Sequence, residues 1–151
     1  MHHHLKEKIY LLFQQIINER ITRLQNVLAD LKESAANETK STAGDKHETA
    51  LAMLQTEQKN IKGQLEDAQI QKSELNKINP LLSPDKIVKG SLVETNRGYF
   101  FVSAALGKVV TEGITVTSLS PLSPLGENIM GLHAGKTATI NGNIFEIKSV
   151  C

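Results

Sequence analysis

The sequence predicts an α+β fold, in which an N-terminal antiparallel coiled-coil hairpin is followed by a small antiparallel β domain with one short helix. Helix-forming residues dominate from residue 5 to about residue 79, and apolar residues recur there at coiled-coil spacing. After that point Gly, Pro and β-branched residues become frequent, and the apolar period becomes strand-like. We therefore expect a hairpin over residues 5–79, a linker over 80–86 and a β domain over 87–151.

Each arm of the expected hairpin carries an apolar stripe with alternating steps of four and three residues. The first stripe consists of Ile17, Ile21, Leu24, Leu28, Leu31 and Ala35, and it is extended toward the N-terminus by Ile9, Leu12, Phe13 and Ile16. The second consists of Leu51, Leu54, Ile61, Leu65, Ala68 and Leu75, with polar Gln58 and Lys72 at two seam positions. Such stripes need each other, because either arm alone would leave its stripe in water. A short connection favours an antiparallel pair about 45 Å long.

The arms part at a cluster of turn-forming residues, Ser41 to Asp45, which places the tip of the hairpin near residues 41–48. Two carboxylates, Asp45 and Glu48, stand three residues apart where the second arm begins. This spacing is typical of a helix cap, with Asp45 as the capping residue and Glu48 reaching back to its backbone N–H. The same pair is also suited to binding a divalent cation together with a partner's oxygen atoms. The two interpretations are compatible in a free protein.

The second arm is expected to end at Asn79-Pro80, because the residue before proline is disfavoured in the helical region. Two strands, residues 87–95 and 99–104, flank Asn96-Arg97-Gly98 and predict a hairpin with glycine in the left-handed conformation. Residues 114–119 form another β-rich run.

A short helix is expected over residues 125–130, with Ser123 as its N-cap and Pro124 at its first position. The last two strands, residues 137–140 and 144–150, surround Asn141-Gly142, which is a strong signal for a two-residue turn.

Composition excludes several classes of protein. The chain has 17 Lys and Arg against 16 Asp and Glu, whereas a general nucleic-acid binder usually shows a basic excess. No apolar run approaches the roughly 20 residues of a membrane span, and no secretory signal is present. We interpret Met1 to His4 as the remnant of a purification tag. The single cysteine, Cys151, excludes an internal disulfide, and a cytoplasmic location is expected.

Several segments resemble the Gre family of bacterial transcription elongation and transcript-cleavage factors. Residues 44–50, Gly-Asp-Lys-His-Glu-Thr-Ala, resemble the family's Gly-Asp-Leu-Lys-Glu-Asn-Ala signature. Residues 87–93 resemble the first strand of its C-terminal domain. Residues 120–126, Ser-Pro-Leu-Ser-Pro-Leu-Gly, resemble its Ser-Pro segment and are followed by a short helix and a glycine turn.

The resemblance implies a C-terminal domain like that of FK506-binding proteins (FKBP-like), which docks on RNA polymerase beside its secondary channel. It also implies that Asp45 and Glu48 are donated to the polymerase active centre. There they would help to hold a shared Mg²⁺ and stimulate cleavage of backtracked RNA, so that contact with the RNA 3′ end is indirect. The chain would then be an accessory factor and not itself an enzyme. It would be a monomer, with no tightly bound metal in the free protein. Ser120, Pro121, Ser123 and Pro124 are candidates for partner contact.

Two alternatives remain open. The family commonly has Asn-Ala-Glu-Tyr after the second acidic residue, whereas this chain has Thr49-Ala50-Leu51-Ala52. One alternative is therefore a Gre-like inhibitor of the secondary channel without cleavage activity. The other belongs to a different class, a non-catalytic coiled-coil adaptor whose β domain binds an unrelated protein.

Overall fold

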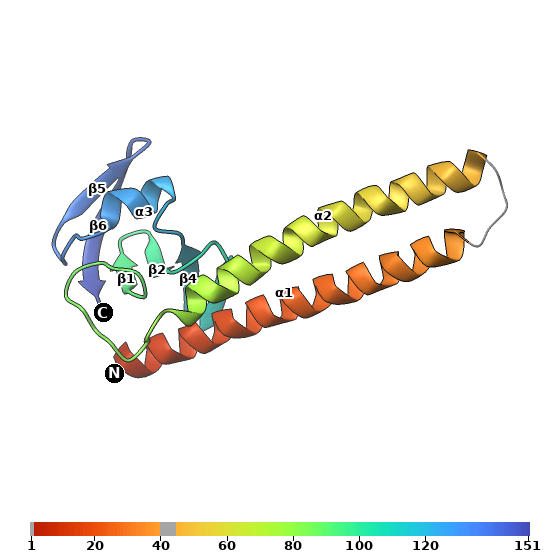
Figure 1. Ribbon diagram of the computed structural model, residues 1–151. Coiled ribbons are helices and arrows are strands. Elements are labelled where there is room, and N and C mark those ends of the chain that lie inside the picture. Colours follow the sequence, from red (N-terminus) through yellow and green to blue (C-terminus); the bar gives the residue numbers. More distant parts are fainter. Residues whose placement is uncertain (1, 40–44) are drawn as a thin grey trace. The chain divides into compact units, whose positions relative to one another are not determined.

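The computed structural model describes residues 2–39 and 45–151, with the backbone only for residues 2, 3, 39 and 45–47. Its elements are α1 (His2–Thr39), α2 (Asp45–Asn76), β1 (Leu92–Thr95), β2 (Gly98–Val102), β3 (Lys108–Thr111), β4 (Ile114–Leu119), α3 (Pro124–Ile129), β5 (Thr137–Ile140) and β6 (Asn143–Val150) (Figure 1). The predicted α+β class is confirmed. The chain divides into two compact units, which we call the arm unit (Ile17–Ile70) and the sheet unit (the chain up to Ile16 together with Gln71–Cys151).

In the arm unit the helices α1 and α2 lie side by side along their predicted stripes (Figure 1). The buried seam residues are Ile17, Ile21, Leu24, Ile61 and Ala68. The half-buried ones are Leu28, Leu31, Ala35, Leu51, Leu54, Gln58 and Leu65. The polar seam residue Gln58 donates a hydrogen bond from Nε2 to the carbonyl oxygen of Leu31, at 3.4 Å. The two sequence stripes therefore supply the buried and half-buried residues of both arms.

The sheet unit contains a six-stranded sheet with the order β3-β4-β2-β1-β6-β5. Its pairs are antiparallel except β2 and β4, which run parallel with Tyr99 opposite Val116. The sheet is therefore mostly antiparallel, as expected, and this pair is the exception. The reason is β3, a strand that the sequence analysis did not predict. The chain passes from β2 to β3 at the sheet edge, and a hairpin then returns it as β4 between them.

The predicted hairpins are present, with shifted strand boundaries. Asn141 and Gly142 connect β5 to β6 with φ angles of 52° and 80°, as a two-residue turn with left-handed backbone requires. In the first hairpin, β1 begins at Leu92 and not at Ile87. Ile87 instead exchanges backbone hydrogen bonds with the segment after α3: its N–H donates to Leu132, and its carbonyl accepts from Gly131.

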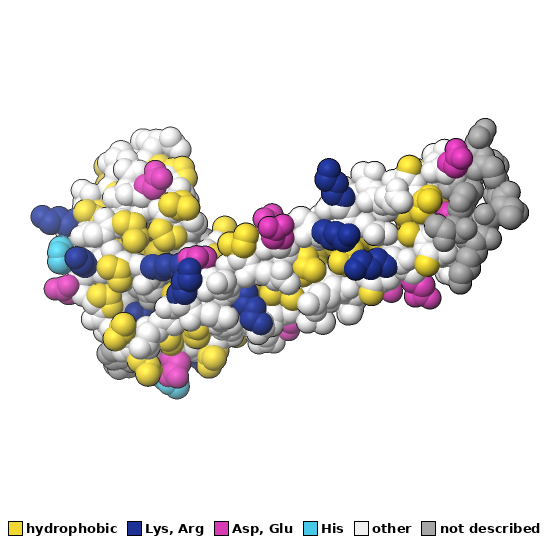
Figure 2. Space-filling model, viewed as in Figure 1, with side chains coloured by type: hydrophobic (Ala, Val, Ile, Leu, Met, Phe, Trp, Pro, Cys, Tyr) yellow, Lys and Arg dark blue, Asp and Glu magenta, His cyan; other side chains and the backbone are white. Residues whose placement is uncertain are grey.

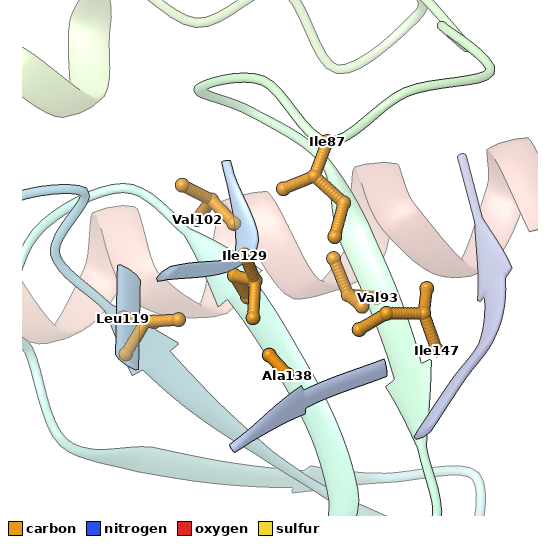
Figure 3. Close-up of a cluster of buried hydrophobic side chains, with 7 residues drawn as sticks. All are labelled: Ile87, Val93, Val102, Leu119, Ile129, Ala138 and Ile147. Atoms are coloured by element: carbon orange, nitrogen blue, oxygen red, sulfur yellow. The ribbon is translucent and has the colours of Figure 1, made fainter. Parts of the chain in front are cut away.

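One buried cluster joins α3 to the sheet. Its members are Ile87, Val93, Val102, Leu119, Ile129, Ala138 and Ile147, and Figure 3 shows these side chains gathered together, with Ile129 contributed by α3. The start of α1 belongs to the same unit, since the ring of Phe13 stacks on that of Phe101 with centroids 5.9 Å apart. Both rings are fully buried. The N-terminal turns of α1 therefore share a core with the sheet.

Candidate functional site

The acidic pair is placed by the start of α2. α1 ends at Thr39 and α2 begins at Asp45, so Asp45 and Glu48 both lie in the first turn of α2. Positions three apart in a helix are neighbours on one face. The side chain of Glu48 is exposed. The side chains of Asp45 and His47 lie outside the described residues, as do residues 40–44, which include the first part of the tip predicted near residues 41–48.

Glu48 lies at the edge of the seam of α2. Leu51 and Leu54, in the next turn of α2, are half-buried. At about 100° per residue, Glu48 lies about 60° from Leu51 around the helix axis and about 120° from Leu54. Glu48 therefore flanks the seam, and its side chain is exposed. A carboxylate in a first helical turn is also stabilised by the helix dipole, by about 0.3–1 kcal/mol. The local fold therefore favours an acidic side chain at this exposed position.

Two neighbouring carboxylates form only part of a cation site. Mg²⁺ prefers oxygen ligands and keeps several waters, and one or two protein carboxylates are enough when phosphates or other groups complete the site. Among the side chains that the structure describes, no group of three or more His, Cys, Asp or Glu residues is placed to hold a metal ion. Two carboxylates in one helical turn could therefore supply only part of the ligands of a Mg²⁺.

The Ser-Pro segment of the sheet unit forms a tight hydrogen-bonded turn ahead of α3. Ser123 Oγ accepts from the N–H of Gly126 at 3.1 Å and donates to the carbonyl of Ser120 at 2.7 Å. Ser120 Oγ accepts from the N–H of Leu122 at 3.2 Å. Pro124 occupies the start of the helix, and the predicted Ser123 cap is confirmed. The hydroxyl groups of both serines therefore form hydrogen bonds that stabilise the turn.

The same turn exposes two apolar side chains. Pro124 is exposed, whereas Ser120, Pro121 and Ser123 are half-buried. Leu122 is 82% exposed, and the sequence analysis did not single it out as a contact residue. The sequence feature that could have indicated its exposure is its position between two Ser-Pro pairs. A side chain within so tight a turn can rarely extend into the core. A contact surface on this segment would therefore centre on Leu122 and Pro124.

The surface carries charge of both signs. On the face shown in Figure 2, Asp and Glu side chains lie among the Lys and Arg side chains. The acidic pair belongs to the arm unit, and the Ser-Pro segment belongs to the sheet unit. In the described part of the chain, no helix is long and apolar enough to cross a membrane.

Comparisons with known proteins give one structural neighbour. No protein-family model matches the chain, and a search of curated proteins finds no match. Among solved structures, the chain is similar to the transcription factor Gfh1, with 16% identity over 91% of this chain and 92% of that one, and a TM-score of 0.37. At this level of similarity, any functional conclusion has to rest on the residues of the chain itself.

Proposed function

We propose that this chain is a transcription elongation factor that binds RNA polymerase at its secondary channel and stimulates Mg²⁺-dependent cleavage of backtracked RNA through Asp45 and Glu48. The observation that carries the proposal is the position of this pair in the first turn of α2, at the end of two long helices joined along an apolar seam. The resemblance of residues 44–50 to the Gre signature supports the same role.

The arms would act as a stiff support for the carboxylates. α1 has 38 residues and α2 has 32, so at 1.5 Å per residue they are about 57 and 48 Å long. The seam residues Ile21, Leu24 and Ile61 are buried, which holds the arms together without any help from the partner. A support of this kind can present a side chain inside a channel that is too narrow for a globular domain.

The role of Asp45 and Glu48 would be to supply oxygen ligands. The Mg²⁺ that they share with the polymerase would provide the second cation that favours phosphodiester hydrolysis. Because two carboxylates alone bind Mg²⁺ weakly, the complete site would form only when the tip reaches the partner's own ligands. The chain would therefore have no nuclease activity by itself.

The sheet unit would provide the docking contact. The exposed side chains of Leu122 and Pro124 are the part of the Ser-Pro segment available to a partner, and the hydrogen bonds of Ser120 and Ser123 keep that segment rigid. A preformed apolar contact of this kind loses little conformational entropy on binding.

A second candidate function, inhibition of the polymerase without cleavage, is favoured by the residues that follow the pair. Leu51 is half-buried at the seam and Ala52 is exposed, so neither provides the acid or the aromatic ring found there in Gre factors. A tip with two carboxylates and no third acid would occupy the channel but would supply fewer polar groups to the polymerase active centre than the tip of a Gre factor. The adaptor alternative predicts no polymerase binding at all.

Binding and cleavage assays separate these functions. The full chain is first tested for co-purification with the host's RNA polymerase, and failure to bind would reject both transcription proposals and leave the adaptor. RNA in stalled elongation complexes is then followed with and without Mg²⁺. Faster Mg²⁺-dependent cleavage supports the stimulator, whereas slower RNA synthesis without cleavage supports the inhibitor.

A further inference from the structure

A cavity of about 520 Å³ lies within the sheet unit. Its lining combines apolar side chains, including Ile78, Leu82 and Val88, with three lysines, Lys6, Lys77 and Lys89. Small-molecule sites in proteins commonly have volumes of about 300–1,000 Å³ and a mostly apolar lining with a few polar groups. The cavity therefore has the size and composition of a ligand site, and we call it the lysine cavity.

Lys6 is the unusual member of this lining. Its side chain is only 1% exposed, and its Nζ donates to the carbonyl oxygen of Leu82 at 2.6 Å. An ammonium group has three N–H donors, and within the described part of the chain this is the hydrogen bond that the structure gives it. Burying a charged group without full pairing is costly. Burial accordingly lowers the pKa of Lys6, although the nearby Cys151 thiol opposes the change.

The other two lysines share one carboxylate. Lys77 Nζ lies 2.9 Å from Glu74 Oε1, and Lys89 Nζ contacts Glu74 Oε2. One negative charge thus faces two positive charges, with Lys6 in addition. The cavity therefore offers an excess of positive charge beside an apolar wall.

We propose that the lysine cavity binds a small anion with an apolar body, namely a carboxylate or a phosphate monoester carried on a hydrocarbon chain. The oxyanion accepts hydrogen bonds from the free donors of Lys6 and is attracted by Lys77. The hydrocarbon packs on Ile78 and Val88. Leu82, whose side chain is 62% exposed, covers part of the ligand and loses water contact on binding.

Local hydrogen bonds hold residues 79–82, the segment that contributes Asn79 and Leu82 to the lining. Asn79 Oδ1 accepts from the N–H of Leu81 at 3.0 Å, and the carbonyl of Asn79 accepts from the N–H of Leu82 at 3.3 Å. Gly90, also in the lining, has a φ of +95°, and a Cβ placed on it would lie 2.9 Å from Ile78 Cγ2. Glycine at this position thus allows the backbone to approach Ile78 and shape the wall.

Octanoate, octyl phosphate and uncharged octanol test the proposal on the full chain by ¹H–¹⁵N NMR titration. We expect saturable shifts of the Ile78, Val88 and Gly90 amides with at least one of the two anions, and the comparison shows which headgroup is preferred. The affinity for octanol should be lower than that for the anion by about tenfold or more, because octanol has no charge to pair with the lysines. Absence of saturable shifts with both anions, or equal binding of octanol, overturns the proposal.

Lysine variants locate the headgroup. Lys6→Met should weaken binding of the anion by about tenfold or more. Lys8→Met is the matched control, since Lys8 lies in the same helix, has a side chain 48% exposed and pairs with Glu112 outside the cavity. If Lys6→Met does not fold, Lys77→Gln replaces it, because the Lys77 side chain is 64% exposed. Wild-type affinity in the variant used would overturn the assignment. This experiment involves no polymerase, so its outcome is independent of the proposed function.

Discussion

Replacing Phe13 by alanine tests whether the start of α1 is part of the core of the sheet unit. The Phe13 ring is fully buried and lies nearly parallel to that of Phe101, with an interplanar angle of 4°. Truncation of a buried phenylalanine to alanine costs about 3–5 kcal/mol through lost transfer energy and the cavity left behind. The ring pair itself accounts for about 0.5–1.5 kcal/mol of this. Phe13→Ala should therefore lower the free energy of unfolding of the sheet unit by about 3–5 kcal/mol.

Urea unfolding, followed by amide signals of the sheet, measures this loss. With a urea dependence of about 2 kcal/mol per molar, the midpoint should fall by about 1.5–2.5 M. Leu11→Ala is the control in the same helix, because Leu11 is 59% exposed and its truncation should cost less than about 1 kcal/mol. If Phe13→Ala is as stable as Leu11→Ala, the start of α1 does not pack on the sheet and this part of the fold is wrong.

Three further predictions concern the sheet unit. Gly126→Ala should lower its stability by about 2 kcal/mol or more in thermal unfolding, because a Cβ at that position would lie 2.0 Å from the backbone oxygen of Ser120; an unchanged melting temperature would contradict the close approach. Ser123→Ala should cost about 1 kcal/mol and Ser123→Thr much less, since threonine keeps a hydroxyl that can both accept from Gly126 and donate to Ser120; equal losses would contradict the capping role. Because the pKa of Lys6 is lowered from its ordinary value of 10.5, the unfolded chain binds more protons between the two pKa values, and the contribution of Lys6 to stability rises with pH there. Urea unfolding of the wild type and of Lys6→Met at several pH values up to 10.5 should show the stability of the wild type rising relative to the variant, and a constant difference would contradict the burial of the charge.

Much of the fold follows from local sequence signals. The seam of the arms follows from spacing alone, because apolar residues at coiled-coil steps have one favourable way to leave water. The Asn141-Gly142 turn and the Ser123 cap follow from backbone preferences of a few residues. The start of α2 at Asp45 lies where the cluster of turn-forming residues predicted that the arms part. These features depend on near neighbours, which a single sequence shows directly.

Features that depend on distant partners were not predictable in this way. β3 has only four residues, and its turn to β4 uses Glu112-Gly113 with left-handed φ angles of 52° and 79°, which is a weaker turn signal than Asn-Gly. The parallel pairing of β2 with β4 follows from that missed strand. Likewise, nothing near Lys6 in the sequence indicates that its ammonium group will donate to the carbonyl of Leu82. The stacking of Phe13 on Phe101 is another contact between residues far apart in the chain.

The most direct test of the central claim is RNA cleavage in stalled elongation complexes with matched variants of α2. Glu48→Gln and Asp45→Ser remove one carboxylate each, and serine retains the ability to cap the helix. Glu57→Gln is the control, because Glu57 is an exposed residue of the same helix away from its first turn. We predict that the wild type and Glu57→Gln accelerate cleavage and that the acceleration falls by about tenfold or more in the two tip variants. Mutation of a residue that only hydrogen-bonds to a metal ligand already lowers metal affinity or activity by ~10–100-fold. Tip variants that bind polymerase and cleave as fast as the wild type would contradict the claim.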